Sequence, residues 1–152
     1  MRRVVVVGRG GAGKSVLSAR LGAALGLPVI ELDSLFWRSP DLVPLSAAEW
    51  RRVQAKLVEE PAWVLDGDLG PYDALEVRLA AADTVVLLDL PLAVCAWRAL
   101  RRSRERLDFW RWVLGYRRVW VPRLLAAVRE HAPQARLRVL RSTAEVRRFL
   151  AE

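Results

Sequence analysis

Short runs of apolar, often β-branched residues alternate with stretches of helical periodicity along the whole chain. The apolar runs predict five strands, at 4–7, 28–32, 63–65, 84–88 and 137–140. A run that is apolar at successive positions is typical of a strand buried on both faces of a parallel sheet. Because helical stretches separate the runs, the pattern predicts one α/β domain over 1–152, in three α/β/α layers.

Several helix ends carry recognisable signals. Two Ser-x-x-Glu capping boxes predict helices that start after Ser46 and Ser142. A long helical stretch over 109–129 contains Pro122, which either kinks it or starts a new helix. Further helices are predicted at 15–25, at 74–82 and from Pro91 onward.

Composition fits a cytoplasmic globular domain. The chain has 152 residues, of which 53% are hydrophobic, so it can bury a core without a covalent staple. A single cysteine, Cys95, excludes an internal disulfide, and a single histidine, His131, excludes a His/Cys zinc cluster. The longest nearly apolar stretch, 84–97, contains Asp89 and is too short to span a bilayer. We therefore expect a cytoplasmic monomer or homodimer without a membrane segment.

The positive charge is concentrated in one segment. Arginine makes up 23 of the 25 basic residues, and 97–123 holds nine arginines and two acids, which is +7 of the net +8. Positive charge concentrated in one segment indicates an anionic partner, either phosphates or nucleic acid. The alternative is a solvated arginine-rich helix without a binding role.

The chemistry-bearing motif is a phosphate-binding loop. Gly8-Arg-Gly-Gly-Ala-Gly-Lys14-Ser15 matches GxxxxGKS in the required position, after a buried strand and at the start of a helix. Glycines let successive backbone N–H groups point at phosphate oxygens, Lys14 adds a point charge, and the Ser15 hydroxyl ligates Mg²⁺. The motif therefore predicts ATP and Mg²⁺ binding by Gly8, Arg9, Gly10, Gly11, Ala12, Gly13, Lys14, Ser15 and Val16.

Other classes of P-loop protein fit less well. Guanine-specific GTPases read their base with an Asn-Lys-x-Asp element, and this chain contains no asparagine. Large motor ATPases need a longer chain than 152 residues. A small kinase that encloses ATP and a second substrate fits the length.

The chain resembles the adenylate-kinase-like P-loop kinases, and among them the DNA topology modulation proteins. The resemblance is carried by the P-loop, by LDSLFW at 32–37, by WVLDG at 63–67 and by LLDLP at 87–91, and it covers nearly the whole chain. It implies a five-stranded parallel sheet of order 2-3-1-4-5 and a short arginine-rich lid at about 101–108. It also implies transfer of the γ-phosphoryl group of ATP to a small-molecule acceptor.

The resemblance also suggests roles for individual residues. Asp33 would contact the acceptor hydroxyl as a general base, with a helix N-cap or turn as the alternative. Asp66 would face the water shell of Mg²⁺, with an Asx turn as the alternative. Arg98 and Arg102 would lie over adenine and reach the ATP phosphates, unless they merely face solvent. Trp37 would line the acceptor pocket. The implied catalytic residues are Lys14, Asp33 and Arg102, and the implied substrate-binding residues are Asp33, Trp37 and Asp66.

Two further acids have competing interpretations. Glu31 resembles the first acid of a D-x-D pair that would hold a magnesium-bound water, and otherwise it is an edge charge. Asp89 resembles the end of a Walker B strand, although we favour a cap on the helix that follows. In the aromatic stretch, the helical spacing of Phe109, Val113, Tyr116 and Trp120 favours a core face.

Two departures from adenylate kinases argue against AMP as the acceptor. Phe36 stands where those enzymes have an AMP-binding arginine, and Asp68 lies in the loop where they have a second. A neutral or cationic hydroxyl or amine acceptor is therefore favoured. The alternative function is a nucleotide-binding regulator, or an ATPase that acts on DNA through the arginine cluster.

Overall fold

The predicted parallel sheet forms the centre of the molecule. The computed structural model describes residues 1–38, 43–102 and 107–152. Five parallel strands lie in the order β2-β5-β1-β6-β7, which is the expected 2-3-1-4-5 order when only the strands of this sheet are counted. Their bounds are β1 (Arg3–Gly8), β2 (Val29–Glu31), β5 (Trp63–Asp66), β6 (Thr84–Leu88) and β7 (Arg136–Leu140).

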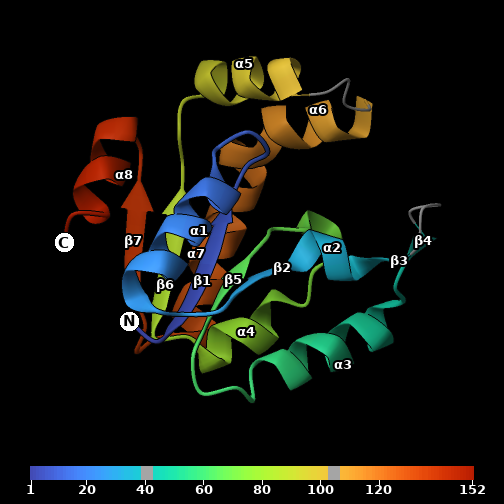
Figure 1. Ribbon diagram of the computed structural model, residues 1–152. Helices are drawn as coiled ribbons and strands as arrows, with labels where there is room; N and C mark the ends of the chain where they lie inside the picture. The colour runs from blue at the N-terminus through green and yellow to red at the C-terminus, as the bar shows by residue number, and fades with distance from the viewer. Residues whose placement is uncertain (39–42, 103–106) are drawn as a thin grey trace.

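The register of the strands sets the edge where chemistry can occur. Val6 of β1 pairs with Asp66 of β5 on one side and with Val86 of β6 on the other. Glu31 of β2 pairs in turn with Asp66. Since all the strands run the same way, the segments that follow Gly8, Glu31 and Asp66 leave the sheet at one edge. Figure 1 shows α5 (Leu92–Arg102) and α6 (Leu107–Gly115) above that edge.

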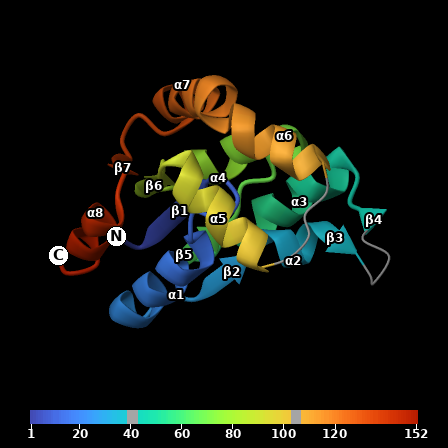
Figure 2. The same cartoon turned by 90° about the horizontal axis from the view of Figure 1, so that it is seen from above.

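Alternation along the strands builds one hydrophobic core on each face of the sheet. Val5 and Val7 point into one core, whereas Val4 and Val6 point into the other. Figure 2 shows helices on both sides of the sheet, which confirms the three layers. The helices around these cores are α1 (Lys14–Leu25) and α8 (Thr143–Phe149) on one side, and α3 (Ala47–Leu57), α4 (Leu75–Ala81) and α7 (Val121–His131) on the other.

The two helices predicted from capping boxes, α3 and α8, start directly after Ser46 and Ser142 as expected. The Ser46 hydroxyl accepts from the Glu49 N–H at 3.3 Å, and the Glu49 carboxylate accepts from the Ser46 N–H at 3.0 Å. The Ser142 hydroxyl likewise accepts from the Glu145 N–H at 3.1 Å. The Glu145 carboxylate, however, accepts from the N–H of Arg141 at 2.7 Å, so the second box is displaced by one residue. No helix of the described ranges is long and apolar enough to cross a membrane.

The strand expected over 28–32 ends earlier than predicted. β2 stops at Glu31, and the next residues form a one-turn helix, α2 (Leu32–Phe36), followed by the antiparallel pair β3 (Trp37–Arg38) and β4 (Val43–Pro44). Phe36 is buried edge-on to Trp50 of α3, with ring centroids 5.2 Å apart. This tertiary contact decides the local structure, which the apolar run alone does not reveal.

The helical stretch over 109–129 is also interrupted. α6 ends at Gly115, a π-helix covers Tyr116–Trp120, and α7 begins at Val121 with Pro122 in its first turn. Pro122 therefore starts a new helix, which was one of the two alternatives. The π-helix rotates α6 relative to α7, so a single 3.6-residue period does not describe both.

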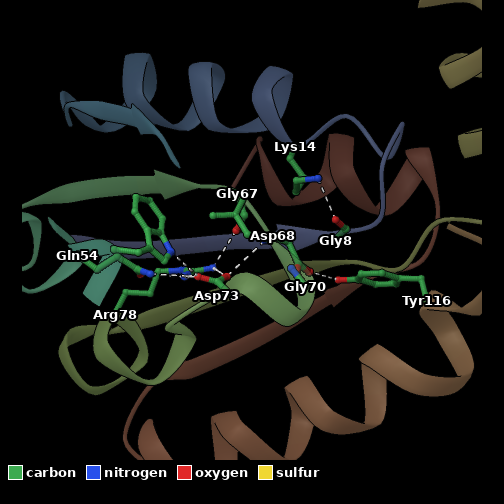
Figure 3. A network of polar contacts seen from close by, with 11 residues as sticks. Gly8, Lys14, Gln54, Gly67, Asp68, Gly70, Asp73, Arg78 and Tyr116 are labelled. Carbon is green, nitrogen blue, oxygen red and sulfur yellow. Dashed lines mark hydrogen bonds and ion pairs between the residues drawn. The ribbon is translucent and has the colours of Figure 1, made fainter. Parts of the chain in front are cut away.

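A buried ion pair holds the loop that follows β5. Both Nη atoms of Arg78, which has no exposed surface, donate to the Asp73 carboxylate at 2.7 Å. Arg78 also donates to the carbonyl of Gly67 and to the side chain of Gln54, both at 2.9 Å (Figure 3). Burial alone would raise the Asp73 pKa, but the charge and hydrogen bonds of Arg78, with help from Gln54 and Trp50, hold it below its ordinary value. Both ends of the loop are thus fixed to one guanidinium.

Replacing Arg78 by methionine should cost about 3–5 kcal/mol of unfolding free energy, because it leaves the Asp73 charge buried without its partner. Urea denaturation of the purified variant measures this loss. Arg51→Met is the matched control, since Arg51 forms an exposed ion pair with Glu76 whose loss should cost less than about 1 kcal/mol. Equal costs for the two variants would contradict the structural role of Arg78.

Candidate active site

A pocket of about 1140 Å³ opens at the carboxyl edge of the sheet. The glycine-rich turn and Arg98 of α5 form one part, and the rest is built by α2, β3, the loop after β5, α6 and the π-helix Tyr116–Trp120. The residues that line it are Gly10, Gly11, Gly13, Lys14, Ser15, Val16, Asp33, Trp37, Asp66, Asp68, Leu69, Pro71, Tyr72, Arg98, Arg111, Trp112 and Trp120. The pocket thus brings together side chains that are distant in the sequence.

The P-loop is a curled turn between β1 and α1, as predicted. Lys14 lies across it, and its Nζ donates to the carbonyls of Gly8 at 2.9 Å and Arg9 at 3.4 Å (Figure 3). Gly11 has a φ of +78°, and a Cβ there would collide with the carbonyl oxygen of Cys95, so α5 packs directly on the loop. The Arg9 side chain is buried against the Tyr116 ring, 5.8 Å from its centroid. Only the backbone of Arg9, and not its side chain, is therefore in a position to contact a nucleotide.

Asp66 and Ser15 meet at the floor of the pocket. Asp66 ends β5 with only 3% of its surface exposed, and the Ser15 hydroxyl donates to its carboxylate. Desolvation by burial raises the Asp66 pKa, while the Ser15 hydrogen bond and the Lys14 charge oppose the rise. Its buried Oδ1 accepts no hydrogen bond from the residues that the structure describes. A hydroxyl beside a buried carboxylate with a free oxygen is an arrangement that suits Mg²⁺ and its water.

Asp33 and Trp37 line the same pocket. Asp33 is the second residue of α2, whose N-cap is Glu31, so the cap alternative for Asp33 does not hold. The Asp33 carboxylate accepts no hydrogen bond from another described residue. Burial in the pocket raises its pKa, Lys14 opposes the rise, and Asp68 adds to it. Trp37 lies edge-on to Phe36, with ring centroids 4.9 Å apart.

The arginines expected to contact ATP are only partly described. Arg98 lines the pocket and donates from Nη1 to the carbonyl of Ala12 in the P-loop at 3.2 Å. The Arg102 side chain and residues 103–106 of the lid predicted at 101–108 lie outside the described residues. Arg101 points elsewhere, with its guanidinium 4.7 Å from the centroid of the Trp97 ring.

The two other acids considered from the sequence do not line the pocket. Glu31 is exposed at the end of β2. Asp89 is buried and forms ion pairs with Arg117 Nε at 3.3 Å and Arg141 Nε at 4.0 Å. Its described side-chain partners are therefore arginines rather than helix N–H groups, so the expected cap on α5 is not found. Of the two strand-end aspartates, Asp66 is the one next to Ser15.

The loop after β5 contributes residues that were not assigned to the site from the sequence. Asp68 accepts a hydrogen bond from the Tyr116 hydroxyl at 2.5 Å and another from the Gly70 N–H at 3.1 Å (Figure 3). Leu69, Pro71 and Tyr72 complete this wall. The position of Asp68 just after a strand end was a signal, but its orientation depends on Tyr116, nearly fifty residues later in the chain.

The aromatic stretch divides between core and pocket. Val113 and Tyr116 are fully buried, as the spacing predicted. Trp112 and Trp120 are only partly buried and line the pocket, together with Arg111. The prediction that Trp120 shares the core face with Val113 was therefore incomplete, because the π-helix intervenes between them.

Comparisons with known proteins agree on the fold. No protein-family model matches the chain, and no curated protein matches it in sequence. Shikimate kinase from Acinetobacter baumannii in complex with shikimate superposes with a TM-score of 0.70 at 18% identity, covering 99% of this chain and 89% of that one. Deoxyadenosine kinase from M. mycoides with bound dATP gives 0.62 at 13% identity, covering 97% of both chains. A gluconokinase from Sinorhizobium meliloti 1021 gives 0.54 at 19%, covering 99% and 91%. The chain has the fold of P-loop kinases.

Millimolar Mg²⁺-ATP should raise the melting temperature by roughly 5–10 °C at a hundredfold excess over Kd, because it binds the native state only. Lys14→Ala should remove most of that shift by deleting the charge that faces the phosphates. Differential scanning calorimetry measures both. Lys56, an exposed lysine of α3, provides the control Lys56→Ala, which should keep the shift. An unshifted wild-type transition would refute nucleotide binding at the P-loop.

Arg98→Ala should weaken Mg²⁺-ATP binding about tenfold, the usual worth of one charge-assisted contact. Isothermal titration calorimetry on wild type and variant gives the ratio. Arg101→Ala is the companion control from the same helix, since Arg101 stacks on Trp97 outside the pocket, and its affinity should stay within about twofold. Equal small effects would mean that Arg98 contributes nothing specific to the nucleotide.

Proposed function

We propose that the protein is an ATP-dependent phosphotransferase that acts on a small hydroxyl compound other than AMP. The observation that carries this proposal is that one pocket joins the P-loop, with Lys14 and Ser15, to the Asp33 carboxylate. The structures of similar fold named above are all kinases, which supports the same reaction class here by analogy of fold.

The nucleotide end of the pocket would bind the phosphates of ATP. Backbone N–H groups of the P-loop and the charges of Lys14 and Arg98 suit the phosphate oxygens. The Ser15 hydroxyl and, through water, the Asp66 carboxylate would hold Mg²⁺, which neutralises charge on the β- and γ-phosphates when bound. Arg102 remains a predicted partner of the phosphates on the sequence resemblance alone.

The acceptor end would orient and deprotonate the hydroxyl. The acceptor oxygen attacks the γ-phosphorus, the bond from that phosphorus to the β–γ bridging oxygen breaks, and ADP leaves with the electron pair. The hydroxyl proton passes to the Asp33 carboxylate and then to solvent. An aspartate whose pKa is raised by its surroundings is a better proton acceptor than an ordinary one. Trp37 would form the adjacent wall of the acceptor site.

Two features of the acceptor end argue against AMP. Phe36, at the position of one expected arginine, is turned into the core against Trp50. Asp68, in the loop expected to hold the other, carries a negative charge into the pocket. A phosphate-bearing acceptor would be repelled there.

The positions of the described arginines in 97–123 favour a kinase over a DNA-acting ATPase. Arg98 and Arg111 line the pocket, Arg117 pairs with Asp89, and Arg123 lies over the Trp120 ring at 5.2 Å. These arginines serve several different contacts rather than one shared surface. We therefore take the resemblance to the topology modulation proteins to indicate a kinase related to adenylate kinase rather than a protein that acts on DNA. A cytoplasmic location stays a prediction.

Asp33→Asn tests the kinase mechanism directly. With an acceptor found by screening hydroxyl and amine compounds for ADP release, transfer should fall by roughly 10²–10⁴-fold, the usual worth of a positioned general base. The Mg²⁺-ATP thermal shift should persist, because the carboxylate touches the acceptor and not the nucleotide. A coupled ADP assay and calorimetry measure the two quantities.

Ser34→Ala is the control for local damage to α2. The Ser34 hydroxyl donates to the Glu31 carbonyl at 2.7 Å, and its loss should leave transfer within about threefold of wild type. Full transfer by Asp33→Asn would remove Asp33 from the mechanism, and loss of its ATP shift would assign the carboxylate to Mg²⁺ instead.

A further inference from the structure

Two carboxylates at the acceptor end of the pocket form no ion pair with a described residue, although the charge of Lys14 acts on Asp33 and that of Arg78 acts on Asp68. Asp33 forms no ion pair and accepts no hydrogen bond there. Asp68 accepts only from neutral donors, the Tyr116 hydroxyl and the Gly70 N–H. Asp73, at the end of the same loop as Asp68, differs because Arg78 neutralises it. Among the described residues, Asp33 and Asp68 therefore remain open to direct ion pairing with a cationic ligand.

The pocket's cations lie mainly at its other end. Lys14 and Arg98 contact carbonyl oxygens of the P-loop, where the phosphates are expected. Arg9 is buried behind the loop, over the Tyr116 ring, and forms no ion pair with Asp68. Arg111 of α6 is the one further cation among the described lining residues. Lys14 and Arg98 thus lie at the P-loop, where Asp66 also stands, whereas Asp33 and Asp68 lie toward the end that we propose binds the acceptor.

Aromatic side chains surround this end of the pocket. Trp37 and Tyr72 are 36% and 64% exposed and flank the buried Phe36. Trp112 packs edge-on to Tyr116, with ring centroids 5.2 Å apart, and so lies close to the residue that holds Asp68. Aromatic faces beside carboxylates bind ammonium groups through cation–π attraction and direct charge pairing.

We propose that the acceptor is a hydroxyl compound that also carries a protonated amino group, and that Asp68, oriented by Tyr116, selects it. This inference rests on the proposed phosphotransfer. The ammonium group pairs with Asp68 between the aromatic walls, and the hydroxyl meets Asp33. The protonated nitrogen has no lone pair, so the phosphoryl group passes to oxygen, with ADP leaving and the hydroxyl proton going to Asp33.

Two matched sets of compounds test this charge preference at pH 7. D-glucosamine, D-glucose and D-glucuronate form one set, and trans-4-aminocyclohexanol, 1,4-cyclohexanediol and 4-hydroxycyclohexanecarboxylate form the other. Kd is measured by calorimetry with Mg²⁺-ADP present, and transfer is measured by ADP release with Mg²⁺-ATP and phosphorus NMR of the product. In at least one set the cationic member should bind at least about tenfold more tightly than the other two members and should be the best acceptor.

Variants identify the residue that causes the preference for cationic compounds. Asp68→Asn keeps the shape and removes the charge, so it should reduce the preference for the cationic member to within about threefold. Tyr116→Phe keeps the charge but loses the hydroxyl that holds it, so it should raise KM for the cationic acceptor with KM for ATP unchanged. Glu60→Gln removes an equal charge from an exposed site outside the pocket. It should change neither the preference for the cationic member nor KM for the cationic acceptor. Melting temperatures establish that each variant is folded.

The outcomes separate this inference from the proposed function. Tighter binding or faster transfer with the neutral or anionic members would overturn the inference and leave the kinase intact. A preference that depends on Arg111→Gln rather than on Asp68→Asn would overturn it as well, as would failure of both cationic compounds to bind at millimolar concentration. Asp68-dependent binding of a cationic compound without any phosphorylated product would overturn the proposed transfer and, with it, the assignment of that compound as acceptor.

Discussion

The parallel pairing of β1 with both β5 and β6 is the constraint on which the rest of the structure depends. It fixes Val6 opposite Asp66 and sends Gly8 and Asp66 out of the sheet at one edge. The P-loop can then curl above its own strand while Ser15 reaches the carboxylate of the neighbouring one. A shift of this register by one residue would turn Asp66 to the other face of the sheet and separate it from Ser15. The geometry of the phosphate end thus follows from backbone pairing rather than from flexible side chains.

The parts of the fold that could be predicted are those in which local pattern and tertiary role agree. The valines at 4–7 are apolar on both faces because both faces are covered, and Ser46 starts α3 because its cap is complete within four residues. The hydrophobic pattern does not predict local structure where contacts between residues distant in the sequence determine it. Phe36 belongs to a one-turn helix because Trp50 packs on it, and Arg78 looks like a surface charge on α4 until Asp73 folds back over it. Neither contact leaves a periodic signal in the sequence.

The residues of the candidate site also divide into those that the sequence could place and those whose position depends on distant contacts. Asp66 could be placed because it ends β5, and Lys14 and Ser15 could be placed because the P-loop motif joins the end of β1 to the start of α1. Asp33 and Trp37 could be assigned by resemblance, although the intervening helix α2 was missed. The orientation of Asp68 and the exposure of Trp120 to the pocket could not be predicted, since they depend on the π-helix at Tyr116–Trp120, whose extra residue per turn has no reliable sequence signature.

The acceptor wall shows how one buried interaction can set the character of a binding site. Arg78 takes the charge of Asp73 and the carbonyl of Gly67, and so closes the loop at both ends with a single guanidinium. With Asp73 neutralised inside, the loop presents Asp68 alone to the pocket. Tyr116 then holds that carboxylate from the opposite side with a neutral donor, which orients it without cancelling its charge. An arginine in place of Tyr116 would orient Asp68 equally well but would neutralise it. A phenol at this position therefore holds Asp68 without an ion pair, so that its carboxylate keeps its charge at the end of the pocket that we propose binds the acceptor.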